Sequence, residues 1–184
     1  MAHLRADYYV GWLSAAALHG ASHHAPQVVQ VATARHVADR TVGRSHLHFL
    51  TRGSVGLVPA TRVSSPSGTL TVSTPGATML DIAEDTGEAG GLDYAATVIA
   101  ELAWENAGYL ADVVIAAPFH SDAAVRRVGW ILDEIAGEDG LDALERLTIG
   151  TATYPSFLSP YDGRISDVNV RWMINVNRKV EPDL

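Results

Sequence analysis

The residues of this chain that could do chemistry are its eight histidines and one group of carboxylates. His19 and His23 are four residues apart with His24 adjoining, and His46 and His48 would share one face of a strand, so both sets could hold a metal ion. However, a glycine interrupts the helix that would align the first pair, and no His-Glu-x-x-His motif is present. We therefore predict that the histidines are partly exposed and form no metal site, and that the chain has no cofactor. A metal-dependent hydrolase is the less favoured alternative.

The carboxylates of Asp81, Glu84 and Asp85 recur at helical spacing. Only Asp81 lies near the apolar face of the predicted helix, which indicates a hydrogen-bonding or capping role rather than acid–base catalysis. The sequence has no Gly-x-Ser-x-Gly elbow and no phosphate-binding loop. Lys179, the sole lysine, has no acidic residue two positions before it, as a PD-(D/E)xK nuclease site would require. No catalytic residue is predicted, and the chain is not expected to be an enzyme.

Composition narrows the class of protein further. The 184 residues include 21 acidic and 13 basic side chains, a net charge of −8, which disfavours a surface that neutralises many phosphates. The absence of cysteine excludes disulfides and thiolate chemistry. Apolar runs are short and no signal peptide is recognisable, so we expect a cytoplasmic protein that does not enter a membrane.

The elements that must position these residues change in type along the chain. Alternating and β-branched runs predict a meander of short strands at 27–33, 46–51, 61–63 and 69–72, and a closing strand that returns to the sheet at 172–177. Apolar periodicity predicts helices over 8–20, 75–86, 94–107, 109–117, 122–136 and 141–147, with Thr74, Asp93 and Ser121 as caps and a loop over 151–164. This pattern predicts an α+β fold, a mostly antiparallel sheet of short strands with several helices packed on it, as a single domain spanning 1–184.

Four segments carry a resemblance to a known family. They are YYVGWLSAAALHG at 8–20, STPGATMLD at 73–81, RRVGWIL at 126–132 and RWMINVN at 171–177. In this order they resemble the effector domain of AbiEi-type antitoxins, in which a winged helix-turn-helix normally precedes the first block. The resemblance implies an antitoxin whose partner is a co-encoded nucleotidyltransferase-like toxin. Because the winged helix would dock in the major groove and is missing here, DNA binding is not expected.

Two sets of residues follow as candidates for binding. If the chain binds a toxin, exposed aromatic and arginine side chains should anchor the interface; the candidates are Trp12, Trp104, Arg126, Arg127 and Trp130. The alternative is a nucleic-acid-binding transcriptional regulator that uses the arginine-rich segment 35–62, where five arginines face one acid, Asp39. Its candidates are Arg35, Arg40, Arg44, Arg52 and Arg62.

Overall fold

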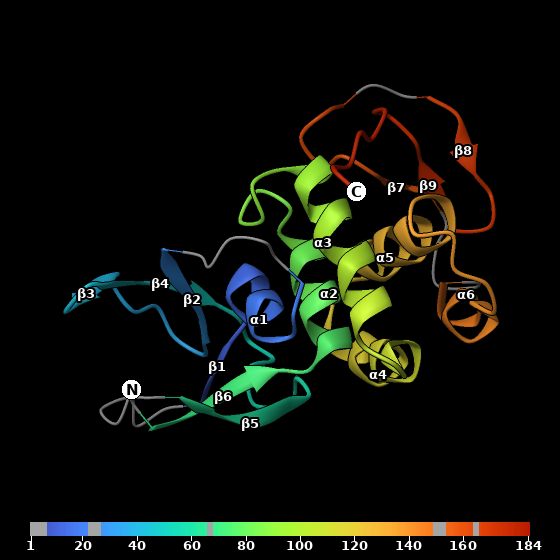
Figure 1. Ribbon diagram of the computed structural model, residues 1–184. Helices are drawn as coiled ribbons and strands as arrows, with labels where there is room; N and C mark the ends of the chain where they lie inside the picture. The colour runs from blue at the N-terminus through green and yellow to red at the C-terminus, as the bar shows by residue number, and fades with distance from the viewer. Residues whose placement is uncertain (1–6, 22–26, 66–67, 149–153, 164–165) are drawn as a thin grey trace.

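The computed structural model describes residues 7–21, 27–65, 68–148, 154–163 and 166–184. Within these ranges the chain is an α+β fold in which a layer of helices lies between a six-stranded sheet and a small three-stranded sheet (Figure 1). The strands are β1 (Tyr8–Val10), β2 (Val28–Thr33), β3 (Arg40–Val42), β4 (Ser45–Thr51), β5 (Ala60–Ser65), β6 (Gly68–Ser73), β7 (Ser156–Phe157), β8 (Val168–Asn169) and β9 (Ile174–Asn175). The helices are α1 (Trp12–Leu18), α2 (Pro75–Glu84), α3 (Leu92–Glu105), α4 (Tyr109–Ala116), the short 3-10 turn η1 (Ala117–Phe119), α5 (Asp122–Glu134) and α6 (Asp142–Thr148).

The large sheet has the order β3-β4-β2-β1-β6-β5, with three antiparallel and two parallel pairings. The four predicted strands between 27 and 72 are confirmed, but the meander is wrong. β2 pairs with β4 in parallel along its whole length, and β1 lies between β2 and β6. The predicted helix at 8–20 is also wrong for its first three residues, because the aromatic and β-branched run Tyr8–Val10 suits a buried central strand.

Helix α2 is the centre of the core. Eight of its ten residues are buried, and it packs against α1, α3, α4 and α5. Figure 1 shows it in the middle of the helical layer, next to the large sheet. A helix that is apolar around nearly its whole circumference is stable only when it is buried, and the four surrounding helices bury α2.

The start of α2 is capped by a neighbouring helix rather than by its own N-cap residue. Thr74 occupies the N-cap position as predicted, but its hydroxyl makes no cap bond and donates to Asp112 Oδ1 at 2.8 Å. The amide of Gly76 donates to Asp112 Oδ2 at 2.6 Å. A Cβ at Gly76 would lie 2.2 Å from the backbone nitrogen of Val113, so only glycine lets α4 approach this closely.

We expect Asp112→Ala to lower the free energy of unfolding by about 1–2 kcal/mol, the typical loss for a helix cap. The substitution leaves the amide of Gly76 without its acceptor at a helix start that is buried. Urea denaturation followed by circular dichroism measures the change. Asp139→Asn, at an exposed site, is the control and should stay within about 0.5 kcal/mol of the parent.

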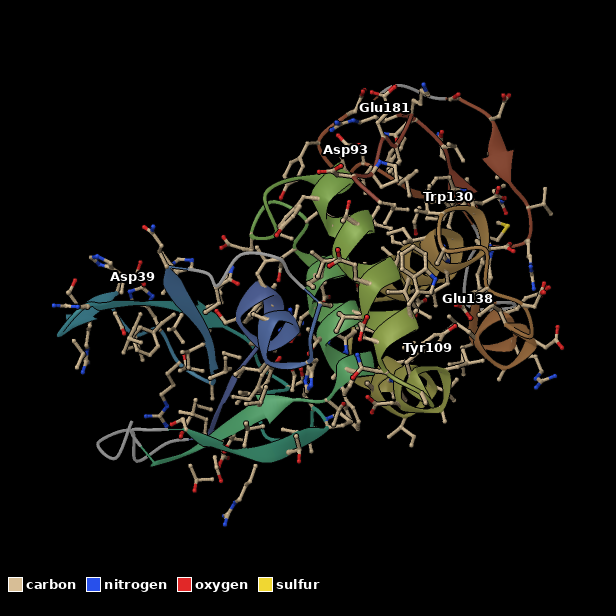
Figure 2. All side chains as sticks on the ribbon, viewed as in Figure 1. Asp39, Asp93, Tyr109, Trp130, Glu138 and Glu181 are labelled. Carbon is tan, nitrogen blue, oxygen red and sulfur yellow. The ribbon has the colours of Figure 1, made fainter. Side chains whose placement is uncertain are left out.

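Two further caps can be compared with prediction. Ser121 caps α5 as predicted, with its hydroxyl accepting from the amide of Ala124 at 3.3 Å. Asp93 does not cap α3, whose N-cap is Gly91; it lies in the first turn and accepts from the amide of Glu181 at 3.0 Å. Figure 2 shows Asp93 and Glu181 close together at one end of the helical layer.

The C-terminal segment forms its own small sheet, of order β7-β9-β8, against α5. The closing strand is confirmed at Ile174–Asn175, but its return to the large sheet is wrong, because its partners among the described strands are β7 and β8. Of the loop predicted over 151–164, residues 154–163 are described and include β7, while its remaining residues lie outside the described ranges. Among the described residues, no helix combines the length and the apolar character needed to cross a bilayer.

Candidate functional site

A group of interacting polar side chains lies between the large sheet and the helices. We call it the Asp81 cluster; its members are Tyr9, Arg52, Asp81, Glu84, Asp85 and His120. Asp81 is fully buried, and its Oδ1 accepts from the hydroxyl of Tyr9 at 3.0 Å and lies 3.1 Å from Nε2 of His120. The hydrogen-bonding role predicted for Asp81 is therefore confirmed.

Arg52 supplies the positive charge of the Asp81 cluster. Its guanidinium contacts Glu84, lies 3.0 Å from Asp85 Oδ2 and 3.4 Å from Asp81 Oδ1, and its side chain is only 11% exposed. Burial alone would lower the pKa of Arg52, but the neighbouring carboxylates, led by Asp81, raise it overall. Burial would raise the pKa of Glu84, and the hydrogen bond from Arg52 lowers it instead. For Asp85, burial outweighs Arg52 and the pKa is raised.

Trp12 closes the cluster from the side of α1. Its ring stacks on that of Tyr9 with centroids 6.4 Å apart, and the guanidinium carbon of Arg52 lies 5.2 Å from the ring centroid. Trp12 has φ of 49°, a left-handed conformation that non-glycine residues rarely adopt. A Cβ at Gly11 would lie 2.8 Å from Asp81 Oδ2, so the glycine lets the strand-to-helix turn fold directly over the carboxylate.

An open cleft of about 400 Å³ lies beside the cluster. Its lining includes Trp12, Arg52, Asp85, Phe119 and His120. Nδ1 of His120 lies 3.1 Å from the carbonyl of Ala116 and Nε2 lies 3.1 Å from Asp81, so both ring nitrogens are engaged within the fold. The arrangement is that of a network joining the sheet to the helices.

The structure buries four of the five residues predicted to anchor a partner. Trp12 and Trp130 are in the core, and Figure 2 shows Trp130 among the helices. Arg126 and Arg127 are buried as well, so none of these four side chains is displayed to a partner. Trp104, on α3, is 52% exposed.

The two buried arginines of α5 hold the C-terminal segment instead. Arg126 donates to the carbonyl of Tyr154 at 3.2 Å and to Ser156 Oγ at 3.0 Å. Arg127 donates to the carbonyls of Phe157 and Leu158, and to that of Ala83 at 2.6 Å. Burial lowers the pKa of Arg127. Backbone carbonyls and a serine hydroxyl thus accept hydrogen bonds from these two guanidiniums, and sequence spacing does not reveal such acceptors.

The arginines of segment 35–62 do not gather on one surface. Arg40 lies on β3 and Arg44 follows it, at one edge of the large sheet, whereas Arg62 lies on β5 at the opposite edge (Figure 1). Arg35 follows β2 and is exposed, and Arg52 is bound in the Asp81 cluster. No continuous basic face for nucleic acid is formed by these five side chains.

The histidines of β4 make local polar contacts. His46 Nδ1 lies 3.0 Å from the hydroxyl of Thr41, while His48 lies 2.8 Å from Asp39 and 3.2 Å from Glu88 in the turn between α2 and α3. His23 and His24 lie outside the described residues. No group of three metal-ligating side chains occurs in the part of the chain that the structure describes.

We expect the outer strands of the large sheet, β3 and β4, to loosen as the pH rises. The hydrogen bond to Asp39 raises the pKa of His48 above its ordinary value of 6.5, despite partial burial. Such a group stabilises the fold fully below about pH 6.5, and this stabilisation is lost as the pH rises through the raised pKa. Amide hydrogen exchange of β3 and β4, corrected for intrinsic rates, should accelerate between pH 6 and 8, and His48→Gln should abolish the change. Equal pH dependence in the parent and the variant would contradict the assignment.

Comparison with known proteins agrees with this architecture. The crystal structure of the RV2827C protein from Mycobacterium tuberculosis is similar, with a TM-score of 0.63 at 14% sequence identity, over 94% of this chain and 63% of that chain. At this identity the likeness shows the fold alone, and this chain spans less than two thirds of the length of that protein. No curated protein matches the chain. A family model described as the AbiEi antitoxin C-terminal domain matches residues 9–134, well over half of the sequence. The chain therefore belongs to the family of AbiEi antitoxin C-terminal domains.

Proposed function

We propose that this chain neutralises a nucleotidyltransferase-like toxin encoded beside it, by binding the toxin in the cytoplasm rather than by catalysing a reaction. The observation that carries the proposal is the match of residues 9–134 to the antitoxin family, which implies a toxin partner. The net charge of −8 supports it, because an enzyme that handles nucleotides and RNA presents basic surfaces that an acidic partner complements.

The geometry of the Asp81 cluster supports a role without catalysis. Its arginine and its histidine are held by groups of the fold, and its carboxylates are bound to Arg52 or buried. Of the anchors predicted from sequence, Trp104 remains as the proposed contact with the toxin, because its side chain is displayed on α3.

Co-expression with the neighbouring gene product tests the proposal. The chain should restore growth to cells that express the toxin, and a tagged chain should co-purify with it. In a purified assay of the toxin's nucleotidyl transfer, activity should fall linearly as the chain is added and reach its end point at a fixed molar ratio. Absence of growth rescue would overturn the proposed function. Complete suppression by a small molar fraction of the chain would instead indicate a catalytic antitoxin.

A further inference from the structure

An exposed aromatic side chain lies beside a small acidic hollow at the C-terminal end of α3. We call this the Trp104 surface; the hollow, of about 250 Å³, is lined by Gly20, Glu101, Trp104, Glu105, Asp183 and Leu184. The end of α1 is held against it, since Asn106 Nδ2 donates to the carbonyl of His19 at 3.2 Å. Leu18, the last residue of α1, is also exposed. The surface thus combines apolar side chains with three carboxylates.

The charges and the exposed aromatic residue of the Trp104 surface are energetically unfavourable in the isolated chain. Glu101 and Glu105 are four residues apart on one helix, where like charges repel. Glu105 is the last residue of α3 and Glu101 lies about one turn before it, where the helix dipole already presents negative charge and the last turn holds no basic residue. Trp104, a large aromatic residue that is 52% exposed, lies in the same turn. Departures from local stability of this kind are typical of functional surfaces.

Charge in the surrounding sequence is one-sided. Residues 63–125 contain nine acidic residues and no lysine or arginine. Several other carboxylates in this stretch have partners within the fold: Arg52 contacts Glu84, His48 contacts Glu88, and Arg178 contacts Asp93. Within the described ranges, the carboxylates of Glu105 and Asp183 form no ion pair. The Trp104 surface therefore has negative charge that the chain leaves unneutralised.

We infer that a lysine or arginine side chain of the toxin docks on the Trp104 surface, with its cation over the indole ring and between Glu105 and Asp183. A cation in this position complements the negative end of α3 and gains a cation–π contact with Trp104. A toxin that binds nucleotides and RNA carries basic side chains around its active cleft, so their capture also masks that cleft. The inference rests on the proposed function.

Binding of the purified chain to the purified toxin, measured by calorimetry at low and at high salt, tests the inference. Trp104→Ala and Glu105→Lys should each weaken the affinity at least about tenfold, as expected for an anchor at the centre of an interface. Glu105→Gln should weaken it less and should reduce its dependence on salt. Tyr154→Ala, which removes a side chain on a residue that is 80% exposed, and Asp139→Asn are the matched controls and should bind as the parent does.

Two checks separate loss of contact from loss of fold. Glu105→Gln should keep or raise the melting temperature, because it removes a negative charge from the negative end of a helix. In a scan of the toxin's basic residues to glutamate, one change should restore binding to Glu105→Lys. Affinities of Trp104→Ala and Glu105→Lys within twofold of the parent would overturn the inference. Growth rescue without any complex would also overturn it and leave neutralisation intact, whereas failure of rescue overturns the proposed function itself.

Discussion

Replacing Arg52 with alanine is expected to lower the free energy of unfolding by about 3–5 kcal/mol near pH 7, the usual loss when one partner of a buried ion pair is removed. The guanidinium carries the permanent positive charge of the Asp81 cluster and contacts Asp81, Glu84 and Asp85. Without it, Asp81 stays fully buried and Glu84 and Asp85 stay partly buried, and all three carboxylates lose their counter-charge. Urea denaturation measures the difference between variant and parent.

The loss should shrink as the pH falls. In the parent, the pKa of Glu84 is lowered, so its stabilising effect is present above its ordinary value of 4.5 and disappears as the pH falls through the lowered pKa. In Arg52→Ala, burial is no longer opposed by the arginine and raises the pKa of Glu84 and Asp85. Protonation at mildly acidic pH then reduces the destabilisation of the variant, while the parent loses stability.

Two variants serve as controls for the arginine. Arg62→Ala, at an exposed position of β5, should change the free energy of unfolding by less than about 0.5 kcal/mol. The loss of stability for Arg52→Lys should lie between those of the other two variants. A lysine ammonium keeps the positive charge but lacks the planar guanidinium that donates to two carboxylates at once. A loss for Arg52→Ala below about 1 kcal/mol, or one that does not vary with pH, would show that the cluster contributes little to stability.

Adding one methyl group at Gly129 is expected to lower the free energy of unfolding by about 3 kcal/mol, at the upper end of the range for overpacked cores. A Cβ there would lie 2.1 Å from two ring carbons of Trp172. The ring is fully buried and fixed, since its Nε1 donates to Asp133 Oδ2 at 2.7 Å and the guanidinium carbon of Arg171 lies 5.1 Å from its centroid. Neither α5 nor the indole can move aside without breaking these contacts.

Thermal and urea unfolding of Gly129→Ala measure this effect. Gly163→Ala is the matched control, because its Cβ would meet no atom within 4 Å. In the double variant Gly129→Ala/Trp172→Leu, the smaller side chain leaves room for the methyl group, so its loss should be less than the sum of the two single losses. Strict additivity would mean that the methyl group and the indole do not compete for the same space.

The sequence predicted the type of most elements but not how they meet. Helices α2 to α6 and strands β2, β4, β5 and β6 follow from periodicity and turn residues, which are local. The parallel pairing of β2 with β4 and the central place of β1 depend on contacts between distant segments, such as Val10 with Val72. The residue pattern within a strand does not indicate which other strand it will pair with.

The same limit applies to the candidate site. The place of Asp81 near an apolar helix face predicts its hydrogen-bonding role, but its partners Tyr9 and His120 are 72 and 39 residues away. The arginines near Arg52 in the sequence suggest contact with nucleic acid, whereas its neighbours in space are acidic. For Arg126 and Arg127, a signal was present: they lie within the apolar run from Val125 to Leu132 of a helix that is buried along most of its length.

The central position of β1 has a consequence for synthesis of the chain. β1 joins β2 on one side and β6 on the other, so among the described strands the two halves of the large sheet meet through the three residues of β1. Because β6 ends more than sixty residues later, β1 leaves the ribosome roughly 3–12 s before its second neighbour at 5–20 residues per second. During this interval its aromatic and β-branched edge is open to other nascent chains, and the sheet closes only after α1 to β6 have emerged.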